Sequence, residues 1–213
     1  MTGEGQARPT QAATTLLAQK ARAELHAEFD GVHSPETVDR VFDESLEQFG
    51  SADVPDYVST LARRVARDRL RALGQVEGTI AHDLPEVVFV GLEGRGRSQM
   101  AAALLELRSD GQIHAVHAGT SPNITLDPNV IAAMAEIGCD LTESYAKPIS
   151  PEVLEAADVV VTLGRSVGPI AIPESAKHED WRVGDPVGAS IGEVRRIRAE
   201  LEGRIDDLIA ELM

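Results

Sequence analysis

The stretch that decides the fold is VVFVGLEGRGRSQMAAALL, residues 87–105. Four apolar residues lead into a glycine-rich turn, and a segment of strong helix formers follows. A turn from a buried parallel strand into a helix aims several backbone N–H groups and the positive end of the helix dipole at one point. The sequence therefore predicts a cradle for a phosphate-like anion, with Arg97 and Ser98 as side-chain ligands and Gly91 at its mouth.

Two common nucleotide-binding motifs do not fit this loop. It lacks the Gly-Lys-Ser/Thr ending of a Walker A motif, and its glycines do not have the dinucleotide-binding spacing. The loop alone leaves a second interpretation open, in which the glycines only allow the strand and the helix to pack closely. The candidate anion-binding residues are consecutive: Gly91, Leu92, Glu93, Gly94, Arg95, Gly96, Arg97 and Ser98.

Composition excludes several classes of protein. A net charge of −15 argues against nonspecific nucleic-acid binding, which needs clustered Lys and Arg. No apolar run approaches the roughly 20 residues of a membrane helix, and the N-terminus has no secretory pattern. We therefore expect a cytoplasmic location with no membrane partner. One cysteine, Cys139, rules out an internal disulfide and a cysteine-based zinc site, and we expect no metal or cofactor.

The N-terminal part of the chain has the pattern of a separate helical domain. Residues 1–10 are polar with Gly and Pro, which predicts a disordered tail. Helical spacing of apolar residues predicts a three-helix domain over 11–75, with Ser34-Pro35-Glu36 opening its second helix. Residues 76–85 lack a clear period and are predicted to be a linker.

The third of these helices is rich in arginine. Asp56 and Asp68 lie among the basic residues, which favours a solvated face over a nucleic-acid surface. The arginines expected to face solvent are Arg63, Arg64, Arg67, Arg69 and Arg71.

Residues 86–213 show alternating strands and helices. Strands are predicted at 87–90, 112–119 and 158–164, and helices at 98–107, 127–137, 150–157 and 190–212. This alternation predicts an α/β domain with a doubly wound parallel sheet, preceded by the small three-helix domain. Ligands bind beyond the carboxyl ends of the strands in such sheets, where the glycine-rich loop lies.

The loop resembles that of the low-molecular-weight protein tyrosine phosphatases, and more closely that of the thioredoxin-coupled arsenate reductases, which reads V-x-F-V-C-x-x-N-x-G-R-S-Q-M. The resemblance continues through HAGTSP (117–122), KPIS (147–150), ADVVVTLG (157–164) and EDWRVGDPVG (179–188). SPETVDRVFDESLEQF (34–49) and LARRVARDRLRAL (61–73) are similar to the helical extension of actinobacterial arsenate reductases. The similarity spans nearly all of residues 11–213.

This resemblance implies a specific chemistry. In the family, a cysteine thiolate at the first loop position attacks phosphorus or arsenic. The arginine and the loop amides stabilise the equatorial oxygens, and the aspartate of a late Asp-Pro pair, here Asp185, protonates the leaving oxygen. In the reductases, two further cysteines after the third strand relay a disulfide to thioredoxin.

The sequence departs from that pattern at the reacting positions. Gly91 stands at the nucleophile position, and Gly94 replaces the asparagine that braces the family loop. Glu93 brings a carboxylate into the cradle, and Arg95 replaces a small residue. The positions of the two redox cysteines correspond to Arg165 and Pro169.

Other side chains favour a structural role over a chemical one. Cys139 follows the helix-ending Gly138 and is expected to act as a small buried hydrophobe. Ser98 lies beyond the arginine and has no nearby histidine in the loop to activate it as a nucleophile. The spacing of His114 and His117 does not imply a metal. His178 and Trp181, which lie near Asp185 in the sequence, are either lid or packing residues.

Three functions follow from these observations. We favour a catalytically inactive protein that binds a phosphate, sulfate or arsenate-like oxyanion, alone or on a partner. A second hypothesis is a weakly active arsenate reductase or phosphatase with rearranged chemistry, for example a phosphatase acting through water with Asp185 or Glu93 as the base. The third is an interaction protein in which the N-terminal helices form a homodimer or contact an intact paralogue.

Overall fold

The computed structural model describes residues 11–49, 55–94, 96–121, 126–142, 144–164 and 167–213. The chain divides into two compact units, Met1–Ile80 and Ala81–Met213. The tail expected at residues 1–10 lies outside the described residues. No helix in the described ranges combines the length and the apolar character needed to cross a membrane.

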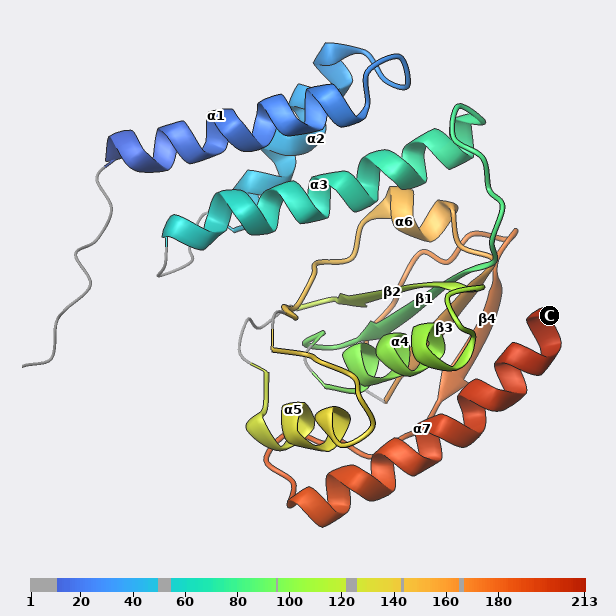
Figure 1. Cartoon of the computed structure of the whole chain (residues 1–213). Helices are drawn as coiled ribbons and strands as arrows, with labels where there is room; N and C mark the ends of the chain where they lie inside the picture. The colour runs from blue at the N-terminus through green and yellow to red at the C-terminus, as the bar shows by residue number, and fades with distance from the viewer. Residues whose placement is uncertain (1–10, 50–54, 95, 122–125, 143, 165–166) are drawn as a thin grey trace, which may run out of the picture. The chain divides into compact units, whose positions relative to one another are not determined.

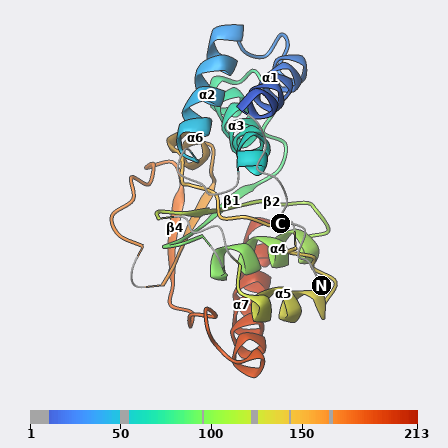
Figure 2. The same ribbon diagram turned by 90° about the vertical axis from the view of Figure 1, so that its left-hand side faces the viewer.

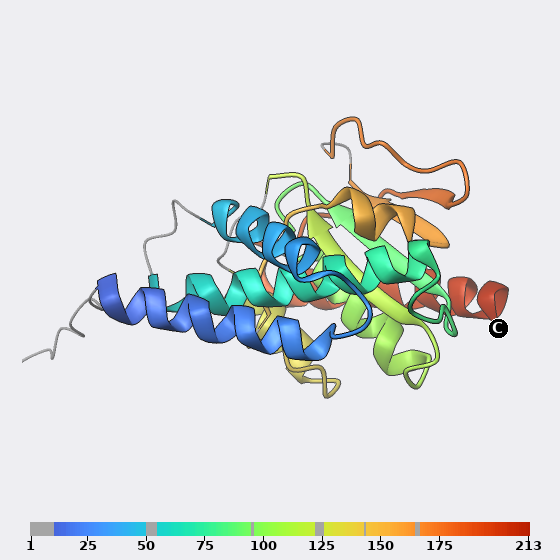
Figure 3. The same cartoon turned by 90° about the horizontal axis from the view of Figure 1, so that it is seen from above.

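The first unit contains three helices that pack against one another (Figures 2 and 3). They are α1 (Gln11–Glu28), α2 (Pro35–Glu47) and α3 (Pro55–Glu77). Apolar side chains at the predicted helical spacing fill the space between them, with Leu25, Phe42 and Leu70 fully buried. The predicted start of α2 is confirmed, because the Ser34 side chain accepts a hydrogen bond from the Thr37 amide at 3.2 Å.

The prediction that the α3 arginines face solvent is wrong for Arg69, which is only 5% exposed. Its Nη2 donates to Glu44 of α2 at 2.6 Å, while Arg63 and Arg67 pair with glutamates of α1. The reason is that acidic residues on the two neighbouring helices face α3, so a long arginine stem is buried while its charged end is paired.

The second unit is built on a parallel sheet with the strand order β2-β1-β3-β4 (Figure 1). The strands are β1 (Glu86–Gly91), β2 (His114–Gly119), β3 (Val159–Leu163) and β4 (Lys177–Trp181). The predicted doubly wound parallel sheet is confirmed. Strand β4 was missed because KHEDW is a polar edge strand in which only Trp181 is buried.

Helices cover both faces of this sheet. Figure 1 shows α4 (Arg97–Arg108), α5 (Pro128–Ala135) and α7 (Ile191–Leu212) on one face and the short α6 (Pro151–Glu155) on the other. The chain leaves β1 toward β2 and leaves β3 toward β4, so its connections diverge at the carboxyl ends of these two adjacent strands. This divergence is the usual position of a ligand site in such sheets.

Candidate functional site

A cavity of about 400 Å³ opens at the carboxyl end of β1. It contains six of the eight predicted loop residues and adds Asp185 and Val187 from a segment after β4; the loop residues are Gly91, Leu92, Glu93, Gly94, Arg97 and Ser98. Gly96 is the N-cap of α4, and Arg95 lies outside the described residues. The structure therefore brings the loop together with the candidate acid.

The first two loop carbonyls point away from the cavity, toward the end of β2. Gly91 O accepts from Thr120 N at 3.1 Å, and Leu92 O accepts from Ser121 N at 2.7 Å. These backbone bonds fix the loop to the end of its neighbouring strand, and Thr120 Oγ1 adds a side-chain contact to Leu92 O at 3.4 Å. They also remove two acceptors from the anion side of the loop.

Gln99, which the sequence analysis did not single out as a site residue, braces the middle of the loop. Its side chain is buried, and Nε2 donates to Gly94 O at 2.8 Å. Gly96 O accepts the first helical bond of α4, from Met100 N at 2.8 Å. The sequence offered two hints, a polar residue in the first turn of a buried helix and the glutamine of the family pattern. With these carbonyls occupied, the loop offers mainly donors to a ligand.

Close backbone contact with β2 explains why glycine stands at position 94. Gly94 has φ +62°, and a Cβ on Gly119 would lie 2.6 Å from Gly94 N. Neither residue tolerates a larger side chain without moving the loop. This contact and the Gln99 hydrogen bond hold the loop at the position where the family pattern has asparagine.

Arg97 is held at the cavity wall by three contacts. Nη1 donates to Val183 O at 3.3 Å, and Nη2 pairs with Asp185 Oδ2 at 3.2 Å. The guanidinium also lies against Gly164, where a Cβ would be 2.8 Å from Arg97 Cζ. Gly164 has φ +89° and directly follows β3, and its role was not predicted. Only glycine satisfies both the backbone conformation and this close approach.

The first loop position has space for a side chain that Gly91 lacks. A Cβ there would lie 3.5 Å from Ser98 Oγ and 3.8 Å from Gly94 N, which are ordinary contacts, and Gly91 is not in the left-handed region. Ser98 is 1% exposed, and its Oγ has no hydrogen-bond partner among the described residues. The α4 N-cap, Gly96, supplies no side-chain cap, so donors border the space in front of Gly91.

Residues 86–213 match the family described as low molecular weight phosphotyrosine protein phosphatase. The chain belongs to this family. Residues 18–74 match a second family, the N-terminal domain of protein-tyrosine-phosphatase-like proteins.

The similar proteins include arsenate reductases. A Synechocystis sp. protein named glutaredoxin arsenate reductase is 30% identical over 132 residues, which are 61% of this chain and 99% of that protein. The structure of a thioredoxin-dependent arsenate reductase from Corynebacterium glutamicum aligns with a TM-score of 0.80 at 30% identity, covering 93% of this chain and 97% of that one. An arsenate reductase solved in the phosphate binding state aligns with a TM-score of 0.55 at 30% identity, over 61% of this chain and 100% of its own.

The cysteine of this family member lies in the core. Cys139 is 8% exposed, and its Sγ lies 3.8 Å from Ala103 O. Burial raises the pKa of its thiol, and the nearby Glu106 carboxylate raises that pKa further. Reactive cysteines have a lowered pKa, so this environment favours the packing role.

The two histidines of β2 are not among the residues that line the loop cavity. His114 Nδ1 lies 2.9 Å from Glu86 Oε1, and burial, with a smaller contribution from the Lys147 charge, lowers the pKa of His117 to about 3. His117 is therefore neutral at physiological pH. Within the described ranges, no group of three or more His, Cys, Asp and Glu could hold a metal ion.

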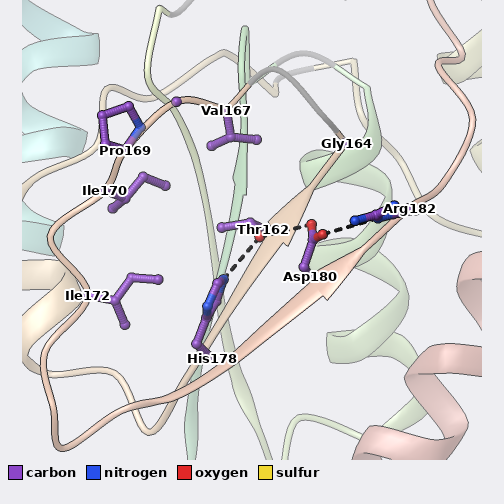
Figure 4. Close-up of a pocket in the computed structure, with 10 residues that line it drawn as sticks. Thr162, Gly164, Val167, Pro169, Ile170, Ile172, His178, Asp180 and Arg182 are labelled. Carbon is purple, nitrogen blue, oxygen red and sulfur yellow. Dashed lines mark hydrogen bonds and ion pairs between the residues drawn. The ribbon is translucent and has the colours of Figure 1, made fainter.

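A second cavity of about 710 Å³ lies over β3 and β4 (Figure 4). His178 Nε2 and Asp180 Oδ1 contact Thr162 Oγ1 at 3.1 and 3.3 Å, and Arg182 Nε lies 3.4 Å from Asp180 Oδ2. The facing wall is apolar and contains Val167, Pro169, Ile170 and Ile172. His178 thus lines this second cavity and is not among the residues of the loop cavity.

Of the two expected redox-cysteine positions, the structure describes only Pro169, which is not among the residues that line the loop cavity. Pro169 lines the second cavity, and Arg165 lies outside the described residues. Trp181, considered as a lid residue, is 4% exposed and packs against Phe89 with ring centroids 5.7 Å apart. It belongs to the core.

Proposed function

We propose that this protein binds an oxyanion in the loop cavity without forming a covalent intermediate. The observation that carries the proposal is the combination of Arg97, Ser98 and the uncapped end of α4 with a glycine at the first loop position. The loop supplies donors for an anion, but position 91 has no side chain to attack it. Cys139, the one cysteine in the sequence, is packed in the core.

Phosphate, sulfate and arsenate fit this donor set. A guanidinium fork and convergent N–H groups are the usual ligands of a tetrahedral oxyanion. The similar arsenate reductase in its phosphate binding state supports phosphate as a ligand. Asp185 shares the Arg97 guanidinium, so its negative charge opposes a bound dianion. We expect Asp185→Asn to tighten phosphate binding by about two- to fivefold, because Asp185 is largely exposed and its field is screened.

Isothermal titration with phosphate and arsenate at low ionic strength tests the proposal. Arg97→Met removes the guanidinium and is expected to abolish binding. Arg182→Met is a matched control, because Arg182 also pairs with an aspartate, Asp180, but lines the second cavity. No heat from the wild-type protein at millimolar phosphate or arsenate would rule out the oxyanion ligand.

Slow hydrolysis by water is the second candidate. It is favoured by the position of Asp185, which lines the cavity beside Arg97 as a general acid or base would, while Glu93 lines the same cavity. Without covalent catalysis the rate would be lower by several orders of magnitude than that of a cysteine enzyme. Hydrolysis of an aryl phosphate that survives Asp185→Asn would exclude Asp185 as the catalytic group.

A homodimer through the N-terminal helices stays a prediction. The helix α1 exposes two leucines, Leu16 and Leu17, at 66% and 39%. Exposed apolar side chains of this kind are suited to a partner surface. Sedimentation at micromolar concentration tests the dimer, and a strict monomer would exclude it.

A further inference from the structure

We infer that the loop cavity contains a second, smaller anion site, a slot for a halide ion between Gly91 and Ser98. The slot adjoins the oxyanion cradle, but the reasons for placing a halide there do not require that an oxyanion binds. Chloride is the abundant ion of this class, and bromide is a suitable probe.

The first observation is the Ser98 hydroxyl. It is 1% exposed, lines the cavity and has no hydrogen-bond partner among the described residues. Leaving a buried donor unsatisfied is unfavourable. The Oγ lies 3.5 Å from the position that a Cβ on Gly91 would occupy, so the hydroxyl borders that space. An acceptor in the space would satisfy it.

The surroundings favour an anion over a water molecule. A buried water needs acceptors for its own protons. The carbonyls of Gly91, Leu92 and Gly94 already accept hydrogen bonds from Thr120, Ser121 and Gln99. The first turn of α4 adds N–H donors without a side-chain cap and the positive end of the helix dipole. An acceptor with a negative charge matches these groups best.

Charge favours a halide over a dianion at this position. Position 91 has no side chain, and the nearest atoms to a Cβ there would be Ser98 Oγ at 3.5 Å and Gly94 N at 3.8 Å, so the ion would lie beyond the Cβ position, in the cavity beside that hydroxyl. Glu93 and Asp185 line the cavity and repel anions. Coulomb repulsion is proportional to charge, so a monoanion is opposed half as strongly as a dianion at the same distance.

The opposite end of α4 provides a matched comparison. Ser109 is the C-cap residue, is 3% exposed and also has an Oγ without a partner in the part of the chain that the structure describes. It lies at the negative end of the helix dipole, which repels anions. The inference therefore assigns a halide to Ser98 and none to Ser109.

The test combines crystallography and titration on the full chain. Crystals grown in sodium bromide are expected to show an anomalous peak within hydrogen-bond distance of Ser98 Oγ. A water molecule at that position, with no anomalous signal, would overturn the inference. In solution, calorimetry measures bromide binding at constant ionic strength, with sodium gluconate as the anion too large for the slot.

Three variants locate the site. Ser98→Ala removes a hydrogen bond to a charged group and is expected to weaken bromide binding by about tenfold or more. Gly91→Ala places a methyl group in the slot at ordinary contact distances and is expected to abolish binding. Ser109→Ala is expected to bind bromide as the wild type does. Wild-type affinity in both Ser98→Ala and Gly91→Ala, measured on variants whose folding is checked by circular dichroism, would contradict the inference.

The outcomes are separable from those of the proposed function. A bromide peak in a protein that gives no heat with phosphate would support the slot and reject the oxyanion ligand. Phosphate binding lost in Arg97→Met, together with the absence of bromide at Ser98, would do the reverse.

Discussion

Gly91→Cys introduces a nucleophile at the first loop position and is the sharpest test of the cavity. The structure accepts the change, because a Cβ there meets Ser98 Oγ at 3.5 Å and Gly94 N at 3.8 Å. No backbone strain is expected, since Gly91 is absent from the positive-φ glycines. The introduced sulfur would lie beside the unpartnered Ser98 hydroxyl and the start of α4.

These neighbours stabilise a thiolate by an amount that can be estimated. A hydrogen bond to a charged group contributes about 1.5–3 kcal/mol, and a helix N-terminus about 0.3–1 kcal/mol. The sum is about 2–4 kcal/mol, which raises the ratio of thiolate to thiol by about 30- to 900-fold at a given pH. The carboxylates of Glu93 and Asp185 reduce this gain, so the lower part of the range is expected.

Alkylation by iodoacetamide at pH 6.5, followed by mass spectrometry, measures the thiolate. In the wild type, the alkylation rate is that of Cys139 alone, and burial raises the pKa of this thiol. We expect the introduced thiol to react at least about tenfold faster than Cys139, to be protected by phosphate and to slow again when Ser98→Ala is added. The same variant should hydrolyse an aryl phosphate that the wild type does not. An introduced thiol that reacts no faster than Cys139 would refute this account of the cavity.

Three further predictions concern residues that stabilise each of the two units. Gly164→Ala should destabilise the protein by about 1–3 kcal/mol more than Gly168→Ala, and it should weaken phosphate binding. Both glycines have positive φ, but only a Cβ on Gly164 would meet Arg97. Urea titration measures the stability difference, and calorimetry measures phosphate binding. Arg69→Ala should lower the free energy of unfolding by about 2–3 kcal/mol, and Arg40→Ala should lower it by less than about 0.5 kcal/mol. Both arginines pair with Glu44, but only Arg69 is buried. Equal losses in the two variants would contradict this reasoning. Between pH 6.5 and 5, the free energy of unfolding of the wild type should fall by about 2 kcal/mol more than that of His117→Leu. The reason is that the His117 imidazole, with a pKa of about 3, stays neutral in the folded protein while the unfolded chain takes up a proton. Parallel pH profiles in denaturant titration would exclude this cause.

The parts of the fold that were predictable are those encoded by neighbouring residues. Strand β1, the glycine-rich turn and α4 follow one another without a break, so periodicity and glycine spacing locate the loop. Strand β4 was missed because its place depends on pairing with β3, for example of Asp180 with Thr162, and no local pattern carries that pairing.

The supporting contacts of the site were beyond prediction for the same reason. Gly164 is remote in sequence from Arg97, and its role appears only when the guanidinium lies on its backbone. The burial of Arg69 depends on Glu44 of another helix. Asp185 was found through the family resemblance, because nothing in its own neighbourhood marks it as a partner of the loop.

The bonds that shape the anion loop have a consequence for how such proteins change over time. Thr120, Ser121 and Gln99 hold the loop through its carbonyl groups, and none of these bonds uses a side chain at position 91. A mutation there leaves the frame intact. Reactivity and architecture can therefore vary separately in this loop, because the single codon for position 91 decides whether a side chain stands in front of the donors.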